Sequence, residues 1–190
     1  MSVPRSSFPT EIANVVVGAD FECELDLLRI AVDMDIGEVD YDADNFPGVI
    51  VRLTEPSATV LVFRSGKVVC TGAETVENAR EAIRVVADHL LDLGAEVADE
   101  PSTHVENIVM NGDLGTSLNL AAIAIGLGLE SVEYEPEQFP GLVYRPEELD
   151  VVLILFSTGK TIITGLTRPG GAKEVLAYVA DRLDEIGLLS

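Results

Sequence analysis

Basic residues are scarce in this chain of 190 residues, which has 12 Lys and Arg against 33 Asp and Glu, for a formal net charge of −21. Proteins usually contact phosphates through Lys and Arg, so the charge balance alone argues against a nucleic-acid partner. Excess acid spread along a chain that has little Lys is instead typical of a protein that works in molar salt. We therefore expect a salt-accumulating source organism.

Cysteine and histidine are also few, with two of each: Cys23, Cys70, His89 and His104. A structural zinc site needs about four such ligands in recognisable pairs, and these four side chains are not spaced in that way. We expect two structural thiols in a reducing cytoplasm, and neither a metal nor another cofactor.

Long hydrophobic runs are missing as well. The longest weakly polar run, residues 118–129, is far shorter than the roughly 20 residues that a membrane-spanning helix needs. The N-terminus has no charged-then-apolar signal pattern. Because 47% of the residues are apolar, a globular core is expected. These features predict a soluble cytoplasmic protein with no membrane partner.

The most informative feature that is present is a duplication. Aligned with itself at an offset of 93 residues, the chain matches without a gap, and 26 of the 87 positions from 11 to 97 are identical to their partners. We expect an N-terminal tail at 1–10, a first repeat at 11–97 and a second at 104–190. Two such copies imply a pseudo-twofold object whose ligand has approximate twofold symmetry.

Each repeat has the same order of expected elements: a strand, a short helix, four strands and a long amphipathic helix. Thr75 is the expected cap of the first long helix, and Gly94 its end. The expected strands are 12–17, 39–41, 49–53, 59–63 and 68–71 in the first repeat, and 105–110, 132–134, 142–145, 151–156 and 161–164 in the second. The expected short helices are 25–32 and 118–125.

Two helices are too few to cover both faces of about five strands. Yet strands such as 151–156 are apolar on both alternating faces, as though each face were buried. Two repeats joined edge to edge would form a ten-stranded antiparallel sheet with helices on one face, an α+β fold. The other face would be a wide exposed apolar surface, which marks a binding site.

Four duplicated motifs are specific enough to resemble a known family: Phe-Pro-Gly-x-x-x-Arg, Phe-x-x-Gly-Lys, Thr-Gly and a leading Asn-x-Val. From about Thr10 onward, the chain resembles the TATA-box-binding proteins of archaeal transcription. The resemblance implies two pseudo-symmetric repeats in a curved, saddle-like sheet with helices on the convex face. It also implies a general transcription factor with no catalytic activity, which binds double-stranded promoter DNA. Kinking of the minor groove by inserted side chains is a mechanism for which this family is itself an established example.

The resemblance also implies roles for particular residues. The side chains that wedge into base steps would be Phe46, Phe63, Phe139 and Phe156. Those that contact bases would be Asn14, Val16, Val69, Thr71, Asn107, Val109, Ile162 and Thr164. Those that hold phosphates would be Arg52, Lys67, Arg145 and Lys160. An acidic turn would dock transcription factor B, and through it RNA polymerase, by Glu135, Glu137 and Gln138.

Other interpretations are weaker. Gly159-Lys160-Thr161 imitates the end of a phosphate-binding loop, but the first glycine of that motif is missing. A module that binds a peptide or helix on the exposed sheet is the alternative to DNA. Whether the free protein forms a homodimer stays open. A net charge of −21 further suggests that DNA binding occurs only in concentrated salt, with a flat or positive dependence of affinity on salt.

Overall fold

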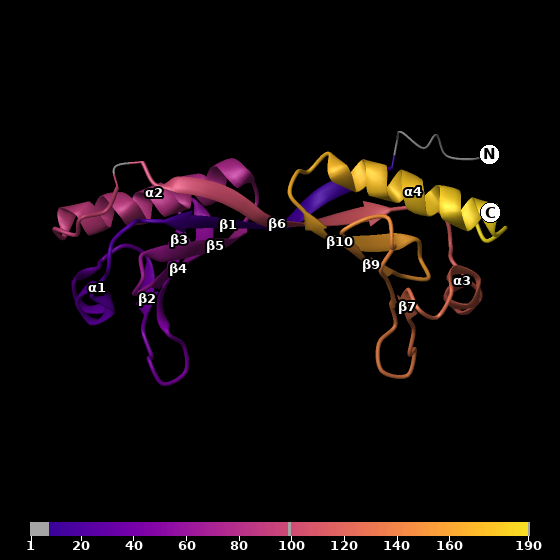
Figure 1. The fold of residues 1–190 in the computed structure, drawn as a ribbon, viewed down its shortest axis with the longest axis horizontal. Helices are drawn as coiled ribbons and strands as arrows, with labels where there is room; N and C mark the ends of the chain where they lie inside the picture. Colours follow the sequence, from indigo (N-terminus) through magenta and orange to yellow (C-terminus); the bar gives the residue numbers. More distant parts are fainter. Residues whose placement is uncertain (1–7, 99, 190) are drawn as a thin grey trace. The chain divides into compact units, whose positions relative to one another are not determined.

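The computed structural model describes residues 8–98 and 100–189, which contain ten strands and four helices (Figure 1). In chain order the elements are β1 (Thr10–Asp20), α1 (Leu27–Asp33), β2 (Glu38–Asp40), β3 (Gly48–Thr54), β4 (Ser57–Phe63), β5 (Lys67–Ala73), α2 (Val76–Asp92), β6 (Ser102–Asp113), α3 (Leu120–Leu127), β7 (Val132–Glu133), β8 (Leu142–Tyr144), β9 (Val152–Leu155), β10 (Lys160–Leu166) and α4 (Gly171–Glu185).

The ten strands form one hydrogen-bonded sheet in the order β2-β3-β4-β5-β1-β6-β10-β9-β8-β7. Neighbouring strands within each repeat run antiparallel. The strands that follow β6 repeat the order of those that follow β1, as a duplicated chain requires. The α+β fold and the ten-stranded sheet that the sequence predicts are therefore confirmed.

The chain forms two compact units, which are described separately. Of the described residues, the first unit contains 14–98 and 100–107, and the second joins 8–13 to 108–189. Strands β1 and β6 each contribute residues to both units. The repeat boundaries predicted from the sequence stay predictions, and residues 1–7 of the predicted tail lie outside the described part of the chain.

In the first unit, α2 packs against β4 and β5 (Figure 1). The helix buries Ile83, Val86 and Leu90 completely, and the strands meet them with alternate residues such as Val60. The side chain of Thr75 accepts a hydrogen bond from the Asn78 amide at 3.0 Å, so this residue caps the helix as predicted. In the second unit, α4 packs on β10 in the same manner.

The two short helices begin two residues later than the sequence predicts, and their caps explain the difference. Asp26 accepts a hydrogen bond from the Arg29 amide at 3.2 Å, and Asn119 accepts one from the Ala122 amide at 3.1 Å. Each polar residue therefore precedes its helix and satisfies an amide of the first turn. Periodicity alone places both residues inside the helices.

Candidate nucleic-acid interface

One side of the strands in each unit is not covered by the long helix, and we call it the open face. Successive side chains of a strand alternate between faces, so buried residues under the helix alternate with half-buried residues on the open face. In the first unit the open face consists of Asn14, Val16, Ile50, Arg52, Thr59, Leu61, Phe63, Lys67, Val69 and Thr71. In the second it consists of Val109, Asn111, Val143, Arg145, Val152, Ile154, Phe156, Lys160, Ile162 and Thr164.

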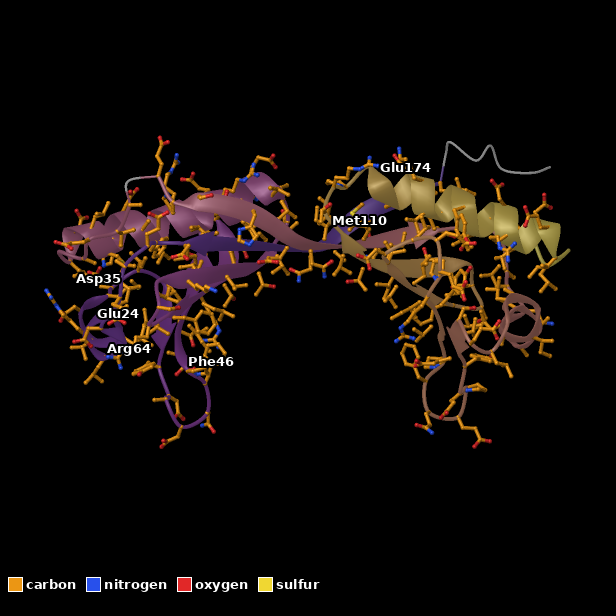
Figure 2. The ribbon with its side chains drawn as sticks, in the orientation of Figure 1. Glu24, Asp35, Phe46, Arg64, Met110 and Glu174 are labelled. Carbon is orange, nitrogen blue, oxygen red and sulfur yellow. The ribbon has the colours of Figure 1, made fainter. Side chains whose placement is uncertain are left out.

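The four predicted wedge residues form two pairs, one in each unit. The rings of Phe46 and Phe63 have centroids 5.6 Å apart and are tilted by 57°. The rings of Phe139 and Phe156 are 6.1 Å apart at 66°, close to an edge-to-face contact. Figure 2 shows Phe46 on the side of the strands away from α2. Phe139 is 41% exposed, which is unusual for so large an apolar side chain.

Glycine in the duplicated Phe-Pro-Gly motif makes room for these rings. A Cβ atom on Gly48 would lie 3.0 Å from Phe46 Cε1 and 3.2 Å from Phe63 Cδ1. On Gly141 it would lie 2.6 Å from Phe139 Cε1. A larger residue at either glycine would require the ring to move away from its present position. The glycine and the ring pair therefore form one structural motif.

The turn before each Phe-Pro-Gly motif is also duplicated. The amides of Asn45 and Phe46 donate to the Asp42 carbonyl at 3.1 and 2.8 Å. In the second unit the amides of Gln138 and Phe139 donate to the Glu135 carbonyl at 2.9 and 3.0 Å. The three residues predicted to dock transcription factor B lie on this second turn, and all are exposed: Glu135, Glu137 and Gln138.

Asn14, a predicted base contact, is held in place by the neighbouring strand. Its Nδ2 donates to Thr71 Oγ1 at 3.2 Å, and its Oδ1 accepts from the Gly72 amide at 2.7 Å. An irregularity in the β1–β5 pairing at Val15 to Val17 accompanies this contact. The amide group keeps a second N–H donor for a ligand. Its repeat partner Asn107 is likewise half-buried on β6.

The two predicted phosphate-binding arginines each contact a carboxylate. Arg52 Nη1 lies 3.4 Å from Glu38 Oε1, and Arg145 Nη1 lies 2.8 Å from Glu133 Oε1. The predicted lysines also have acidic neighbours, because the register sets Lys67 opposite Asp20, and Lys160 opposite Asp113. The cations of the open face are therefore balanced by acidic residues on adjacent strands.

Sequence reasoning missed seven residues of the open face, and two of them extend its apolar strip. Leu61 pairs with Val69 across β4 and β5, and Ile154 pairs with Ile162 across β9 and β10. Both are half-buried and extend the apolar strip onto a second strand. The available signal was their repeat relationship, since Leu61 and Ile154 are 93 residues apart. It was not decisive because these strands are apolar on both faces.

The remaining features do not suggest other chemistry. Burial raises the pKa of the Cys70 thiol to about 11, so this thiol stays protonated at neutral pH and is inert. Within residues 8–98 and 100–189, no three His, Cys, Asp or Glu side chains are grouped so that they could hold a metal ion. Among the helices of the described residues, none has the length and apolar character to cross a membrane.

A duplicated sheet whose open faces carry ring pairs, apolar strips and arginines defines a class of two-repeat binding proteins, and comparison with known proteins identifies the family. The family model described as "Transcription factor TFIID (or TATA-binding protein, TBP)" matches residues 9–93 and 102–186. The chain therefore belongs to the TATA-box-binding protein family.

Individual relatives agree with this assignment. A TATA-box-binding protein of Haloarcula marismortui is 50% identical over 186 residues, covering 98% of each chain. TATA-box-binding protein F of Halobacterium salinarum is 53% identical over 178 residues, covering 94% of this chain and 95% of its own. The solved structure of the Methanococcus jannaschii protein is 41% identical, with a TM-score of 0.83 over 93% of this chain and 98% of its own. The haloarchaeal relatives accord with the salt-adapted source expected from the charge.

Proposed function

We propose that this protein is a general transcription factor that binds T/A-rich promoter DNA in the minor groove and bends it. In this role it acts at the nucleoid, without catalysis, and recruits transcription factor B and RNA polymerase. Family membership supports the proposal, and relatives carry the name TATA-box-binding protein. The observation that carries it is the duplicated pair of phenylalanine rings standing over a glycine on each open face.

The ring pairs would act as wedges. An aromatic ring that enters a base step unstacks it at a cost of a few kcal/mol, and wider contact with the bent DNA offsets that cost. Phe46 with Phe63, and Phe139 with Phe156, would each open one step. Their pairing supports this role because a ring that packs against a second ring would keep its orientation when it contacts the DNA.

Base recognition would come from the apolar strips and the amides. Val16, Val69, Val109 and Ile162 would offer no hydrogen-bond partner to the exocyclic amine of guanine. Asn14 and Asn107 would donate to the acceptors that A and T present on the groove floor, with the hydroxyls of Thr71 and Thr164 beside them. The minor groove distinguishes A·T from G·C but not A·T from T·A, so this recognition would select composition more than order.

Phosphate contacts would come from the duplicated cations. Arg52, Arg145, Lys67 and Lys160 are exposed and lie on the open faces or at their hairpins. They are four of only 12 basic residues in the chain. Phosphates would compete with the neighbouring carboxylates for these side chains, so the balance between them depends on salt.

The test is a titration onto a T/A-rich duplex with end labels that report bending, in molar potassium chloride, with a G/C-rich duplex as control. We expect selective binding with a sharp bend. The double variant Phe63→Ala and Phe156→Ala should reduce the bend more than the affinity. Binding without selectivity or bend would contradict the proposal and indicate that the open faces serve a protein or peptide partner instead.

The exposed turn at Glu135, Glu137 and Gln138 would dock transcription factor B. Its backbone hydrogen bonds support the proposal because they fix the backbone of the turn that carries these exposed side chains. Glu137→Lys should abolish the supershift by transcription factor B while leaving DNA binding intact. Asp44→Lys changes the repeat partner of Glu137 on the other turn, so it is the matched control. Equal effects of both variants would argue against a specific docking turn.

A further inference from the structure

One difference between the two open faces exchanges an amide side chain for a glycine. In the second unit this position is Asn111, which lies opposite Ile162 in the register of β6 and β10. The residue 93 positions earlier is Gly18, which lies opposite Val69 in the register of β1 and β5. One unit therefore presents a side-chain amide where the other presents no side chain.

Asn111 does not stand alone. Its Nδ2 donates to Glu11 Oε1 at 3.2 Å, and Glu11 comes from the part of β1 that belongs to the same compact unit. Glu11 and Asn111 line a hollow of about 680 Å³ together with Phe156, Lys160 and Ile162. A polar pair thus lies directly beside a predicted wedge and a predicted base contact.

The first unit is built so that no such pair can form there. The repeat partner of Glu11 is His104, whose Nε2 lies 2.6 Å from Glu106 Oε1. A Cβ atom on Gly18 would lie only 2.7 Å from His104 Nε2 and 2.8 Å from Glu106 Oε1. The histidine and its glutamate occupy the space that a side chain at position 18 would need. The difference between the two units is therefore structural and not a matter of one substitution.

The chemistry of the minor groove gives this difference a meaning. A·T and T·A pairs present only acceptors on the groove floor, whereas a G·C pair adds one donor, the guanine N2 amine. The carboxylate of Glu11 is an acceptor only, and the Oδ1 of Asn111 is a further acceptor. The Glu11 carboxylate is therefore mismatched with an acceptor-only floor and matched with a guanine amine. Asn111 keeps a second Nδ2 hydrogen, and its Oδ1 supplies a further acceptor for that amine.

We propose that Asn111 and Glu11 recognise a guanine amine, so that the half of the DNA site under the second unit accepts a G·C pair that the half under the first unit rejects. This inference rests on the proposed minor-groove binding. Its consequence is that an asymmetric promoter sequence would orient a nearly symmetric protein. Apolar floors alone give no such direction.

Palindromic duplexes test the inference whichever way round the protein lies on the DNA. Starting from a self-complementary T/A-rich duplex, a G·C pair is placed at one position in one half, and then at the symmetric position in both halves. Each position of the half-site is tested in turn. For wild type, one position should exist where the first G·C pair lowers affinity only about twofold, because one of the two orientations stays favourable. The second G·C pair should lower it by about tenfold or more.

Variants and a modified base assign the effect. In Asn111→Gly, which gives position 111 the residue found at Gly18, the first G·C pair should lower the affinity as much as the second. Glu11→Gln should also make the affinity losses for the first and second G·C pairs more alike, but less so than Asn111→Gly. The reason is that the acceptor remains while its charge is lost. Glu106→Gln makes the same charge change in the other unit, and both affinity losses should stay as in wild type. Replacing guanine by inosine, which lacks the N2 amine, should remove the difference between wild type and Asn111→Gly.

The outcomes are separable from those of the proposed function. Failure to bind and bend the unsubstituted T/A-rich duplex would contradict minor-groove binding itself. Normal binding of that duplex, with equal costs for the first and second G·C pairs at every position in wild type, would overturn the role of Asn111 and Glu11. So would a wild-type pattern that persists in both Asn111→Gly and Glu11→Gln.

Discussion

Arg145 Nη1 donates to Glu133 Oε1 at 2.8 Å, so a side chain proposed to hold a DNA phosphate is held by a carboxylate of its own chain. The same arrangement occurs in the first unit, where Arg52 contacts Glu38. The acidic partners are not repeat equivalents, because 93 residues separate Glu38 from Ser131 and not from Glu133. The two equivalent arginines therefore form ion pairs with glutamates at non-equivalent positions of the two repeats.

Removing this internal competitor should strengthen DNA binding. We expect Glu133→Gln to raise affinity for a T/A-rich duplex by about two- to fivefold, since an exposed ion pair is worth a fraction of a kcal/mol. The gain should shrink as salt rises, because salt screens the ion pair. Fluorescence titration at several potassium chloride concentrations measures it. Glu174→Gln, which breaks the ion pair between Glu174 on α4 and Arg168 before it, is the control. Equal gains from both variants would indicate a general charge effect.

The salt dependence of binding should be flat or positive up to molar potassium chloride. Most DNA-binding proteins release counterions and show a slope of roughly −0.9 per phosphate neutralised. A chain of net charge −21 must instead take up cations between its acidic side chains and the phosphates. A plot of log affinity against log salt gives the slope directly, and a plainly negative slope would refute this expectation.

Phe139 should matter for DNA and little for folding. It is 41% exposed, so Phe139→Ala should change the free energy of unfolding by less than about 1 kcal/mol. Affinity for the T/A-rich duplex should nevertheless fall by about tenfold. Phe21→Ala is the contrasting variant, because Phe21 is completely buried and its loss should cost about 3–5 kcal/mol. Denaturant unfolding and DNA titration of both variants separate the two roles.

Thr161 should be a source of instability in the second unit. Its side chain is 2% exposed, and within the described residues its hydroxyl has no hydrogen-bond partner. Its repeat partner in the first unit is Val68, which is buried to a similar degree. Thr161→Val should raise the free energy of unfolding by about 1 kcal/mol because it removes an unpaired buried hydroxyl. The reverse change, Val68→Thr, should lower it; a loss of stability in Thr161→Val would show that the hydroxyl has a partner.

The contact between Tyr178 and Glu148 should make stability depend on pH at both extremes. The Tyr178 hydroxyl donates to Glu148 Oε2 at 2.5 Å. Burial, and then this hydrogen bond, raise the pKa of Tyr178, and the same bond lowers the pKa of Glu148. The tyrosine contribution is complete below the ordinary pKa of about 10 and is lost as pH rises above it. The glutamate contribution is complete above about pH 4.3 and is lost as pH falls below it.

Unfolding midpoints measured across the pH range check this expectation. Tyr178→Phe should weaken the decline of the midpoint at both ends of the range. Tyr134→Phe, at a half-exposed tyrosine of the same unit, is the control. Parallel pH profiles for wild type and Tyr178→Phe would rule out a role for this pair.

Much of the fold agrees with the patterns seen in the sequence. The duplication was predictable because identical residues recur at one fixed offset of 93 positions. The order of elements along each repeat and the Thr75 cap were predictable because they depend on residues close together in the sequence. The face on which Leu61 and Ile154 lie was not, because strands that are apolar on both sides carry no periodic signal. The placement of Asp26 and Asn119 outside their helices required the actual cap hydrogen bonds.

The site was predictable only as far as its repeats agree. Ring pairs, glycines and cations recur at a fixed offset and could be assigned together. The carboxylates that hold Arg52 and Arg145 do not recur at that offset, and neither does the polar pair at Glu11 and Asn111. Contacts between strands that differ from one repeat to the other emerge only when the register is known.

The contact between Phe139 and Phe156 over Gly141 has a consequence for the rate and cost of association. Side chains that order only when a ligand arrives lose rotational freedom at that moment, and affinity falls accordingly. These rings already lean on one another in the free protein, so their freedom is lost during folding instead. In the proposed binding mode, these rings would meet the DNA already ordered, and the deformation would fall on the double helix.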